Sequence, residues 1–265
     1  DYGSNNTFTG NDSGFKNTIG SRNTFNGRAS GFNSVEGDDN TFMGFESGYG
    51  NTHGSFNIAI GNLSNSLGIN FDNSIGVGYD ADPDASNVVR IGNANITSIK
   101  AKVDITVDSD VRFKTQITRD NIPGIEFIKK LSPVTYYYDS KKYADWKYAQ
   151  YGEKDTSMWD TKYDSDKILT TGFIAQEVEE AANSIGYDFS GIDKPASDKA
   201  TYGLRYSTFV VPLVKAVQEQ QEIIEEQKKR LDAQVNKIIL LEKEITRNDD
   251  QDKRIKELET LVQQL

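Results

Sequence analysis

The first 80 residues place single apolar side chains between glycine and small polar residues, and this pattern recurs every 17 residues. The segments that begin at Asn6, Asn23 and Asn40 share the form NTFxG followed by SG, and residues 57–81 continue the pattern with some slippage. Self-similarity at a fixed period indicates stacked supersecondary units. Because a turn glycine follows every four to eight residues, each unit has room for short strands only. The pattern therefore predicts a β-roll or a triple-stranded β-structure.

Two fixed positions of the repeat suggest how its coils stack. The aromatic position is expected to point inward, and the asparagine to bond its amide onto the next coil. These positions hold Phe8, Phe25 and Phe42, and Asn6, Asn23, Asn40 and Asn57. One coil buries too little apolar surface to be stable alone, so each coil needs neighbours and, we expect, sister chains. The repeats resemble the head repeats of trimeric autotransporter adhesins over roughly residues 5–81.

Two other interpretations of the repeats are weaker. A calcium-binding nonapeptide roll needs a G-G-x-G-x-D rhythm, and aspartate is not periodic in this segment. Composition alone, rich in Asn, Gly, Ser and Thr, is typical of disorder. The regular 17-residue period favours a folded stack over both.

Apolar and polar residues alternate beyond Pro83, which predicts two or three short strands. The apolar members of this alternation are Val89, Ile91, Ile96, Ile99, Val103, Ile105 and Val107. We expect residues 83–108 to form a β-strand neck behind the repeats.

The next segment carries helical spacing twice. A short helix is predicted with Ile125, Ile128 and Leu131 on one face, and Ser132-Pro133 ends it before an aromatic strand. A second amphipathic helix follows within residues 171–186, and its buried side is expected to hold Ile174, Val178 and Ala181 or Ala182. Together these elements predict a small α+β domain over residues 109–205.

The last 60 residues predict one long helix that lacks glycine and proline beyond its first turns. Its apolar positions before the polar break TRNDDQDK are spaced by threes, fours or sevens, with Gln221 and Lys228 at would-be core layers, and the pattern resumes after the break at Ile255; this is typical of an imperfect coiled coil. These positions are Val210, Val214, Val217, Ile224, Leu231, Val235, Ile238, Leu241, Ile245, Ile255, Leu258, Val262 and Leu265. A helix of about 60 residues is roughly 90 Å long, too long to bury on one small domain. Self-association of residues 206–265 is therefore favoured over packing within a single globule.

Composition excludes several classes of site. The chain has 265 residues, a formal net charge of -10 and only 36% hydrophobic residues, so it offers no surface for nucleic acid. Cysteine is absent and His53 is the single histidine, which rules out disulfides, thiolate sites, histidine-based metal sites and Ser-His-Asp triads. His53 itself falls at a variable position of the repeat, where a solvent-facing side chain is expected. We expect no metal and no cofactor.

Two further features concern the membrane and the chain ends. No run of about 18 apolar residues is present, so membrane insertion is not expected. The sequence begins at Asp1, and we expect it to be a piece of a longer chain.

Aromatic residues cluster between Tyr136 and Tyr163. Seven of the 13 tyrosines lie here together with both tryptophans, Trp146 and Trp159. Such a cluster can stack on sugar rings or hold a partner. The simpler interpretation, which we favour, is a strand end followed by an excursion that folds back on its own domain.

Three ordered motifs identify a family. The stretches SDVRFK at 109–114, GFIAQEVEEA at 172–181 and LVKAVQE at 213–219 resemble, in this order, the peptidase S74 family of intramolecular chaperones from phage tail spikes and fibres. The resemblance covers roughly residues 88–230. It implies a homotrimer that folds the upstream fibre segment as its client and then cuts itself off. By position it implies Ser109 as nucleophile, Lys114 as general base and Asp108–Ser109 as the bond cut.

The implied dyad raises two physical questions, one about the protonation of its lysine and one about the spacing of its residues. An ordinary lysine is protonated at neutral pH and cannot act as a base until something buries it; Arg112 would favour loss of that proton, while Asp108 and Asp110 would oppose it. Residues five apart face different sides of a helix or strand. The pair can meet only if residues 109–114 bend, or if Lys114 comes from a neighbouring chain.

The sequence thus predicts a mixed architecture: β-repeats over residues 1–82, a neck, a chaperone domain, and a trimeric coiled coil. The predicted function is a self-cleaving intramolecular chaperone, a serine endopeptidase that acts once and in cis. The alternative is a non-cleaving trimerisation clamp of a tail fibre or bacterial surface adhesin. Either would be found on a virion or outside a bacterial cell. A host surface glycan or receptor is compatible with both, although no residue for it can be named.

Overall fold

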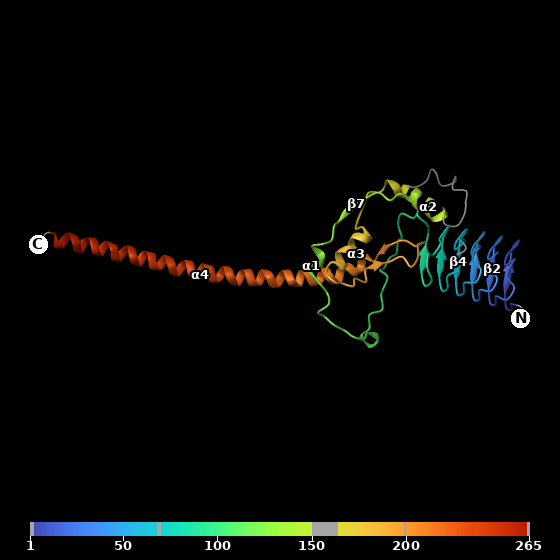
Figure 1. Ribbon diagram of the computed structural model, residues 1–265, viewed down its shortest axis with the longest axis horizontal. Coiled ribbons are helices and arrows are strands. Elements are labelled where there is room, and N and C mark those ends of the chain that lie inside the picture. Colours follow the sequence, from blue (N-terminus) through green and yellow to red (C-terminus); the bar gives the residue numbers. More distant parts are fainter. Residues whose placement is uncertain (1–2, 68–69, 150–163, 199, 264–265) are drawn as a thin grey trace. The chain divides into compact units, whose positions relative to one another are not determined.

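The computed structural model describes residues 3–67, 70–149, 164–198 and 200–263 (Figure 1). The chain divides into two compact units. Unit 1 comprises Asp1–Thr115, Ser132–Glu179 and Ile192–Arg205, and unit 2 comprises Gln116–Leu131, Glu180–Gly191 and Tyr206–Leu265.

The repeats form a parallel β-solenoid in unit 1. Each coil contributes one three-residue strand, and each strand pairs in parallel with the next in sequence order, side by side in Figure 1. The strands are β1 (Thr7–Thr9), β2 (Thr24–Asn26), β3 (Thr41–Met43), β4 (Ile58–Ile60), β5 (Ile75–Val77) and β6 (Val89–Ile91). Thr24 pairs with Thr41 and Phe25 with Phe42, so the sequence period is the strand register. The predicted β-roll is confirmed, and a sixth strand extends it beyond the expected boundary at residue 82.

The solenoid interior holds the two ladders that the repeat predicted. Phe25 and Phe42 are fully buried with their rings stacked at 4.9 Å, and Phe8 stacks on Phe25 at 4.8 Å but stays 36% exposed at the end of the stack. The Asn23 side-chain oxygen accepts a hydrogen bond from the Asn40 backbone N–H at 2.9 Å. Asn57 repeats this contact onto Asn40. Each buried amide therefore satisfies a backbone group of the next coil.

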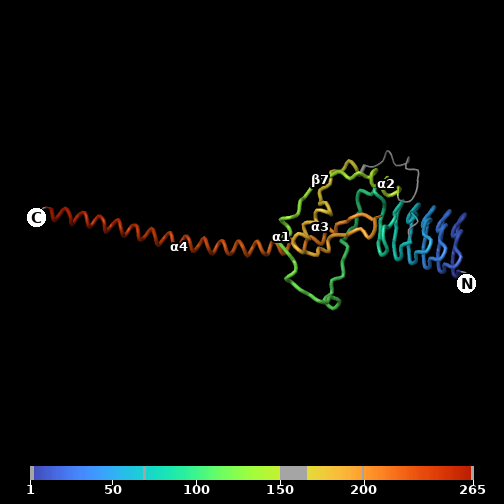
Figure 2. Tube along the Cα trace, in the orientation of Figure 1, coloured from blue at the N-terminus to red at the C-terminus, as the bar shows by residue number. Residues whose placement is uncertain are grey.

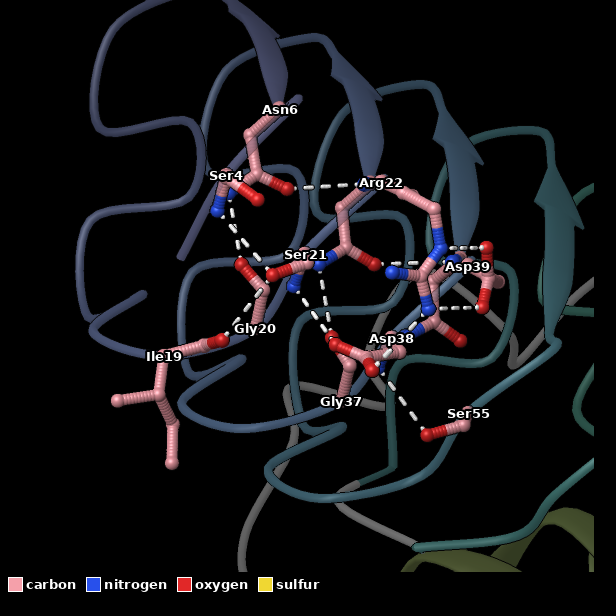
Figure 3. A network of polar contacts seen from close by, with 12 residues as sticks. Ser4, Asn6, Ile19, Gly20, Ser21, Arg22, Gly37, Asp38, Asp39 and Ser55 are labelled. Carbon is pink, nitrogen blue, oxygen red and sulfur yellow. Dashed lines mark hydrogen bonds and ion pairs between the residues drawn. The ribbon is translucent and has the colours of Figure 1, made fainter. Parts of the chain in front are cut away.

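A second polar ladder, which the sequence did not suggest, runs along a corner of the coils. The Ser4 backbone N–H donates to Ser21 Oγ at 3.1 Å, Ser21 N–H to Asp38 Oδ1 at 2.7 Å, and Asp38 N–H to Ser55 Oγ at 3.1 Å (Figure 3). Beside it, the Arg22 guanidinium bonds both carboxylate oxygens of Asp39 at 2.7 Å. A short side chain at this position thus ties each turn to the next.

Close stacking explains one of the periodic glycines. Gly27 has φ +136°, and a Cβ there would lie 2.3 Å from the carbonyl oxygen of Gly44 in the next coil. Only glycine fits this backbone without moving the coil. His53, by contrast, is exposed at its variable position, as expected.

The rest of unit 1 holds short elements. They are η1 (Val111–Phe113), β7 (Val134–Tyr136) paired antiparallel with β8 (Thr170–Gly172), α2 (Ser140–Ala149), η3 (Asp164–Lys167), and the antiparallel pair β9 (Ile192–Asp193) and β10 (Gly203–Leu204). The strand after Ser132-Pro133 is confirmed as β7. Helix α2 was not predicted, because its buried face includes a lysine and breaks the amphipathic pattern.

The predicted strands between residues 96 and 107 do not form. Only Val89–Ile91 of that alternating stretch is a strand, and residues 96–107 form no ladder. A strand needs a partner for its backbone groups, and a single chain offers none here. Its apolar side chains are correspondingly exposed, with Ile105 at 93%.

Unit 2 is built on aromatic packing at the start of the long helix. Phe127 of α1 (Ile125–Ile128) is fully buried and contacts Tyr187 and Phe189, and Phe189 packs edge-on against Phe209 of η4 (Tyr206–Phe209). The apolar spacing predicted a short helix with Ile125, Ile128 and Leu131 on its buried face. That face is only half-buried, because α1 lasts a single turn and points Phe127 inward instead.

The second predicted helix is α3 (Ala175–Asn183), with Val178, Ala181 and Ala182 buried as expected. Ile174 lies just before it and is 42% exposed. The third is α4 (Val210–Val262), 53 residues long and traced as one uninterrupted helix in Figure 2. Of its side chains, Pro212 and Ala216 are buried, and its apolar stripe is exposed in the single chain.

Candidate functional site

A single 3-10 turn shapes the segment that follows the solenoid. Asp110 begins the turn η1, and its carboxylate accepts a hydrogen bond from the Arg112 backbone N–H at 2.9 Å. The same carboxylate pairs with the Arg112 guanidinium at 2.6 Å. The Lys114 N–H closes the turn on the Val111 carbonyl at 3.1 Å, and the backbone returns to an extended conformation at Lys114.

This turn brings the predicted dyad together. Lys114 Nζ lies 2.6 Å from Ser109 Oγ, within hydrogen-bond distance. Residues 109–114 bend, so the two side chains meet within one chain, which is one of the two arrangements that the spacing of five allowed. Asp108 directly precedes Ser109 and is exposed. The structure therefore brings the two predicted site residues together, next to the expected cut bond.

The two neighbouring charges neutralise one another. The side-chain hydrogen bond from Arg112 lowers the pKa of Asp110, and the carboxylate in turn raises the pKa of Arg112. Both groups are engaged in the N-cap of the turn. Neither is left as a free charge directed at Ser109.

Every side chain of this segment is open to solvent. Residues 108–114 are all exposed, and the apolar Val111 and Phe113 are 67% and 83% exposed. A solvated ammonium can donate to a serine hydroxyl but cannot take its proton. The single chain thus shows the dyad assembled but not buried.

A second group of charged residues lies in unit 1 and was missed by the sequence reasoning. Lys147 of α2 is buried between Asp80 and Asp82 at the end of the repeats. The one signal in the sequence was that Asp80 and Asp82 lie where the 17-residue pattern stops.

Part of the described aromatic cluster packs within unit 1, while Tyr136, Tyr137, Tyr138 and Trp146 are exposed. Tyr148 is buried with Leu67 and Ala144, and the Arg90 guanidinium donates to the Tyr143 hydroxyl at 2.7 Å. Trp159 lies outside the described residues. The excursion expected after Tyr148 lies outside the described residues, so it stays a prediction.

Among the residues that the structure describes, no group of three or more acidic or histidine side chains could hold a metal ion. Over the same residues, no helix combines the length and apolarity needed to cross a bilayer.

Residues 109–187 match the family model of the peptidase S74 chaperone of endosialidase. The first matched residue is Ser109, the serine of the dyad. The match confirms the family resemblance for this part of the chain, over a shorter range than the motifs suggested. No curated protein matches the chain. No solved structure matches it either.

Proposed function

We propose that this chain is an intramolecular chaperone that assembles three copies, folds the β-solenoid ahead of it, and then cuts the Asp108–Ser109 bond. The observation that carries the proposal is the 2.6 Å contact between Lys114 Nζ and Ser109 Oγ at the first residue of the chaperone match. A lysine beside a serine hydroxyl is a recurrent way to activate that nucleophile.

Exposed apolar surface supports the assembly of several chains. In the single chain, the stripe along α4 and residues 96–107 leave large apolar side chains in water. The outward-facing strand positions of the solenoid add Met43, Ile60, Val77 and Ile91. Contiguous exposed apolar surface indicates an interface. Three copies would bury the coiled-coil stripe and give residues 96–107 the strand partners they lack.

Assembly also supplies what the chemistry needs. Lys114 must lose its proton to act as a base, and burial favours the neutral amine. Val111 and Phe113 lie between Ser109 and Lys114 in the sequence and are exposed. Their burial against neighbouring chains would therefore remove water from the site. Cleavage would then depend on correct assembly, so the chaperone would not be released before the solenoid has folded.

The reaction we propose proceeds in two steps. Lys114 Nζ takes the hydroxyl proton while Ser109 Oγ attacks the carbonyl carbon of Asp108, which forms a five-membered ring. The ring opens as the C–N bond breaks and the amide nitrogen receives the proton, leaving an ester between Asp108 and Ser109. Water hydrolyses this ester, so that one fragment ends in the Asp108 carboxylate and the other begins with the Ser109 amine.

A second candidate is a chaperone domain that never cuts and remains as a permanent clamp. The observation that favours it is the complete solvent exposure of the dyad. Under either proposal the protein belongs to a tail fibre or spike of a virion, or to a bacterial cell surface. The family model, named for the endosialidase chaperone, supports the virion.

Refolding tests the chaperone role. The Ser109→Ala chain and the fragment 1–108, released by a protease site inserted after Asp108, are unfolded in guanidinium and diluted. We expect only the uncut chain to recover β-structure, as circular dichroism would show, and to reach the mass of a trimer. Equal recovery of the fragment alone would show that residues 109–265 are not needed for folding.

A further inference from the structure

Helix α2 presents one face to the end of the solenoid within unit 1. Tyr143, Ala144, Lys147 and Tyr148 follow the spacing of a single helix face. The last three of them are buried, and Ala144 and Tyr148 form a core cluster with Leu67 of the solenoid. Residues from the chaperone match therefore pack directly on the segment that precedes the expected cut.

Lys147 is the centre of this contact. Its ammonium lies 2.9 Å from the carboxylate of Asp82 and 3.5 Å from that of Asp80, and all three side chains are at least nine-tenths buried. Burial, the largest single influence, lowers the pKa of Lys147, but the two carboxylates together outweigh it and the net direction is upward. The lysine thus stays charged, and a buried charge requires such partners.

Stacking of the coils fixes both carboxylates. Asp82 Oδ1 accepts a hydrogen bond from the Ser66 backbone N–H of the preceding coil at 2.7 Å. The Asp80 N–H donates to the Asn62 carbonyl of that coil at 3.0 Å. Unless the coil that contains β5 lies on the coil that contains β4, the two carboxylates are not held where Lys147 can reach both.

A separate contact reaches the last strand. Arg90 of β6 donates to the Tyr143 hydroxyl at 2.7 Å, and its guanidinium lies over the Tyr143 ring. Helix α2 therefore touches the two final coils at once, one through Lys147 and the other through Tyr143.

We propose that α2 is the surface by which the chaperone recognises the completed end of the solenoid, and that Lys147, bound to Asp80 and Asp82, holds the chaperone fragment on its product after the chain is cut. This rests on the proposed chaperone function but not on self-cleavage. The ion pairs form only on stacked coils, so the contact distinguishes a finished solenoid end from an unfinished one.

The test separates retention from self-cleavage by cutting every variant from outside. All chains carry Ser109→Ala and a protease site inserted after Asp108, and the variants are Lys147→Met, Asp82→Asn, their double mutant and Lys142→Met. Lys142 lies on the same helix and is exposed, so it is the matched control. After the cut, size-exclusion chromatography and native mass spectrometry follow the release of 109–265 from 1–108 with time.

We expect at least tenfold faster release for Lys147→Met than for the parent or Lys142→Met. Asp82→Asn, which keeps an oxygen for the Ser66 N–H, should also speed release, and the double mutant should add less than the two single effects combined. Circular dichroism before the cut shows whether the solenoid is folded. If Lys147→Met prevents folding, Asp82→Asn carries the comparison alone.

Equal release rates for Lys147→Met, Asp82→Asn and Lys142→Met, with folded solenoids, would overturn the inference. A wild-type chain that cuts itself while these variants release equally would leave the proposed function intact. A chain that never cuts itself, but in which Lys147→Met speeds release after the external cut, would support the inference and contradict the proposed self-cleavage.

Discussion

Lys114 Nζ lies 2.6 Å from Ser109 Oγ across one 3-10 turn of the same chain. The two are five positions apart, and the N-cap formed by Asp110 provides the bend that a helix or strand would not. Ser109 and Lys114 therefore meet without a second chain. On our account, neighbouring chains bury this dyad rather than complete it.

The N-cap of this turn gives a pH-dependent prediction. The hydrogen bond from Arg112 lowers the pKa of Asp110 below its usual 3.8, so the carboxylate stabilises the turn above that pH. This contribution is lost as the pH falls through the lowered value. In Arg112→Gln the pKa of Asp110 should rise toward 3.8, as carboxyl chemical shifts followed by NMR would record. Arg119→Gln, remote in sequence, should leave it unchanged; an Asp110 that titrates normally in the wild type would contradict the cap.

The asparagine ladder should be important for solenoid stability. Asn40→Ala leaves the buried Asn57 N–H without its acceptor, whereas the Gly54 carbonyl keeps a bond from Asn51. We expect the free energy of unfolding to fall by about 1–3 kcal/mol. Asn26→Ala, at an exposed strand position, should change it by under about 0.5 kcal/mol. Denaturant unfolding of both variants makes the comparison, and equal losses would show that the ladder is not stabilising.

Alanine substitutions at one glycine position of the repeat distinguish backbone strain from side-chain clashes. Gly48 and Gly14 have φ of +62° and +61°, and a Cβ would lie 2.3 Å from the Phe42 ring in one case and 2.6 Å from the Phe8 ring in the other. Phe42 is fully buried, while Phe8 is 36% exposed and can yield. Gly48→Ala should therefore destabilise the chain by about 1–3 kcal/mol more than Gly14→Ala. Thermal unfolding measures both, and matching shifts would indicate backbone strain alone.

The repeats were the most predictable part of the fold, because register and period are the same quantity in a solenoid. Every asparagine and phenylalanine named from the sequence in the inner coils is buried where it was expected. The Ser21–Asp38–Ser55 ladder escaped notice because its members share short length and hydrogen-bonding capacity rather than identity.

The candidate site was predictable in its residues but not in its geometry. Motif order identified Ser109 and Lys114, yet their contact depends on a turn that Asp110 caps by accepting a hydrogen bond from the Arg112 backbone N–H. The Lys147 contact could not be predicted, since it joins residues 67 positions apart and places a charged residue where an apolar one would mark a buried helix face. The strands expected between residues 96 and 107 were wrong for the single chain because alternation of apolar and polar residues predicts a strand but does not supply its partner.

Assembly through α4 can be tested at one layer of the predicted coiled coil. Leu231 is 58% exposed in the single chain and occupies the apolar stripe. Leu231→Asp would place three carboxylates in one layer, so we expect the trimer to dissociate to single chains. Ala233→Asp adds the same charge roughly 200° around the helix and should leave the trimer whole. Light scattering reports the mass; a trimer that survives Leu231→Asp alone, or dissociates equally in both, would argue against this interface.

The most direct test of the central claim is the intact mass and denaturing-gel pattern of the purified wild type beside Ser109→Ala and Lys114→Met. The account predicts that the wild type separates into 1–108 and 109–265 while both variants stay whole, and that Lys142→Met cuts like the wild type. A wild type that remains whole as a stable trimer, or a Lys114→Met chain that still cuts, would contradict it.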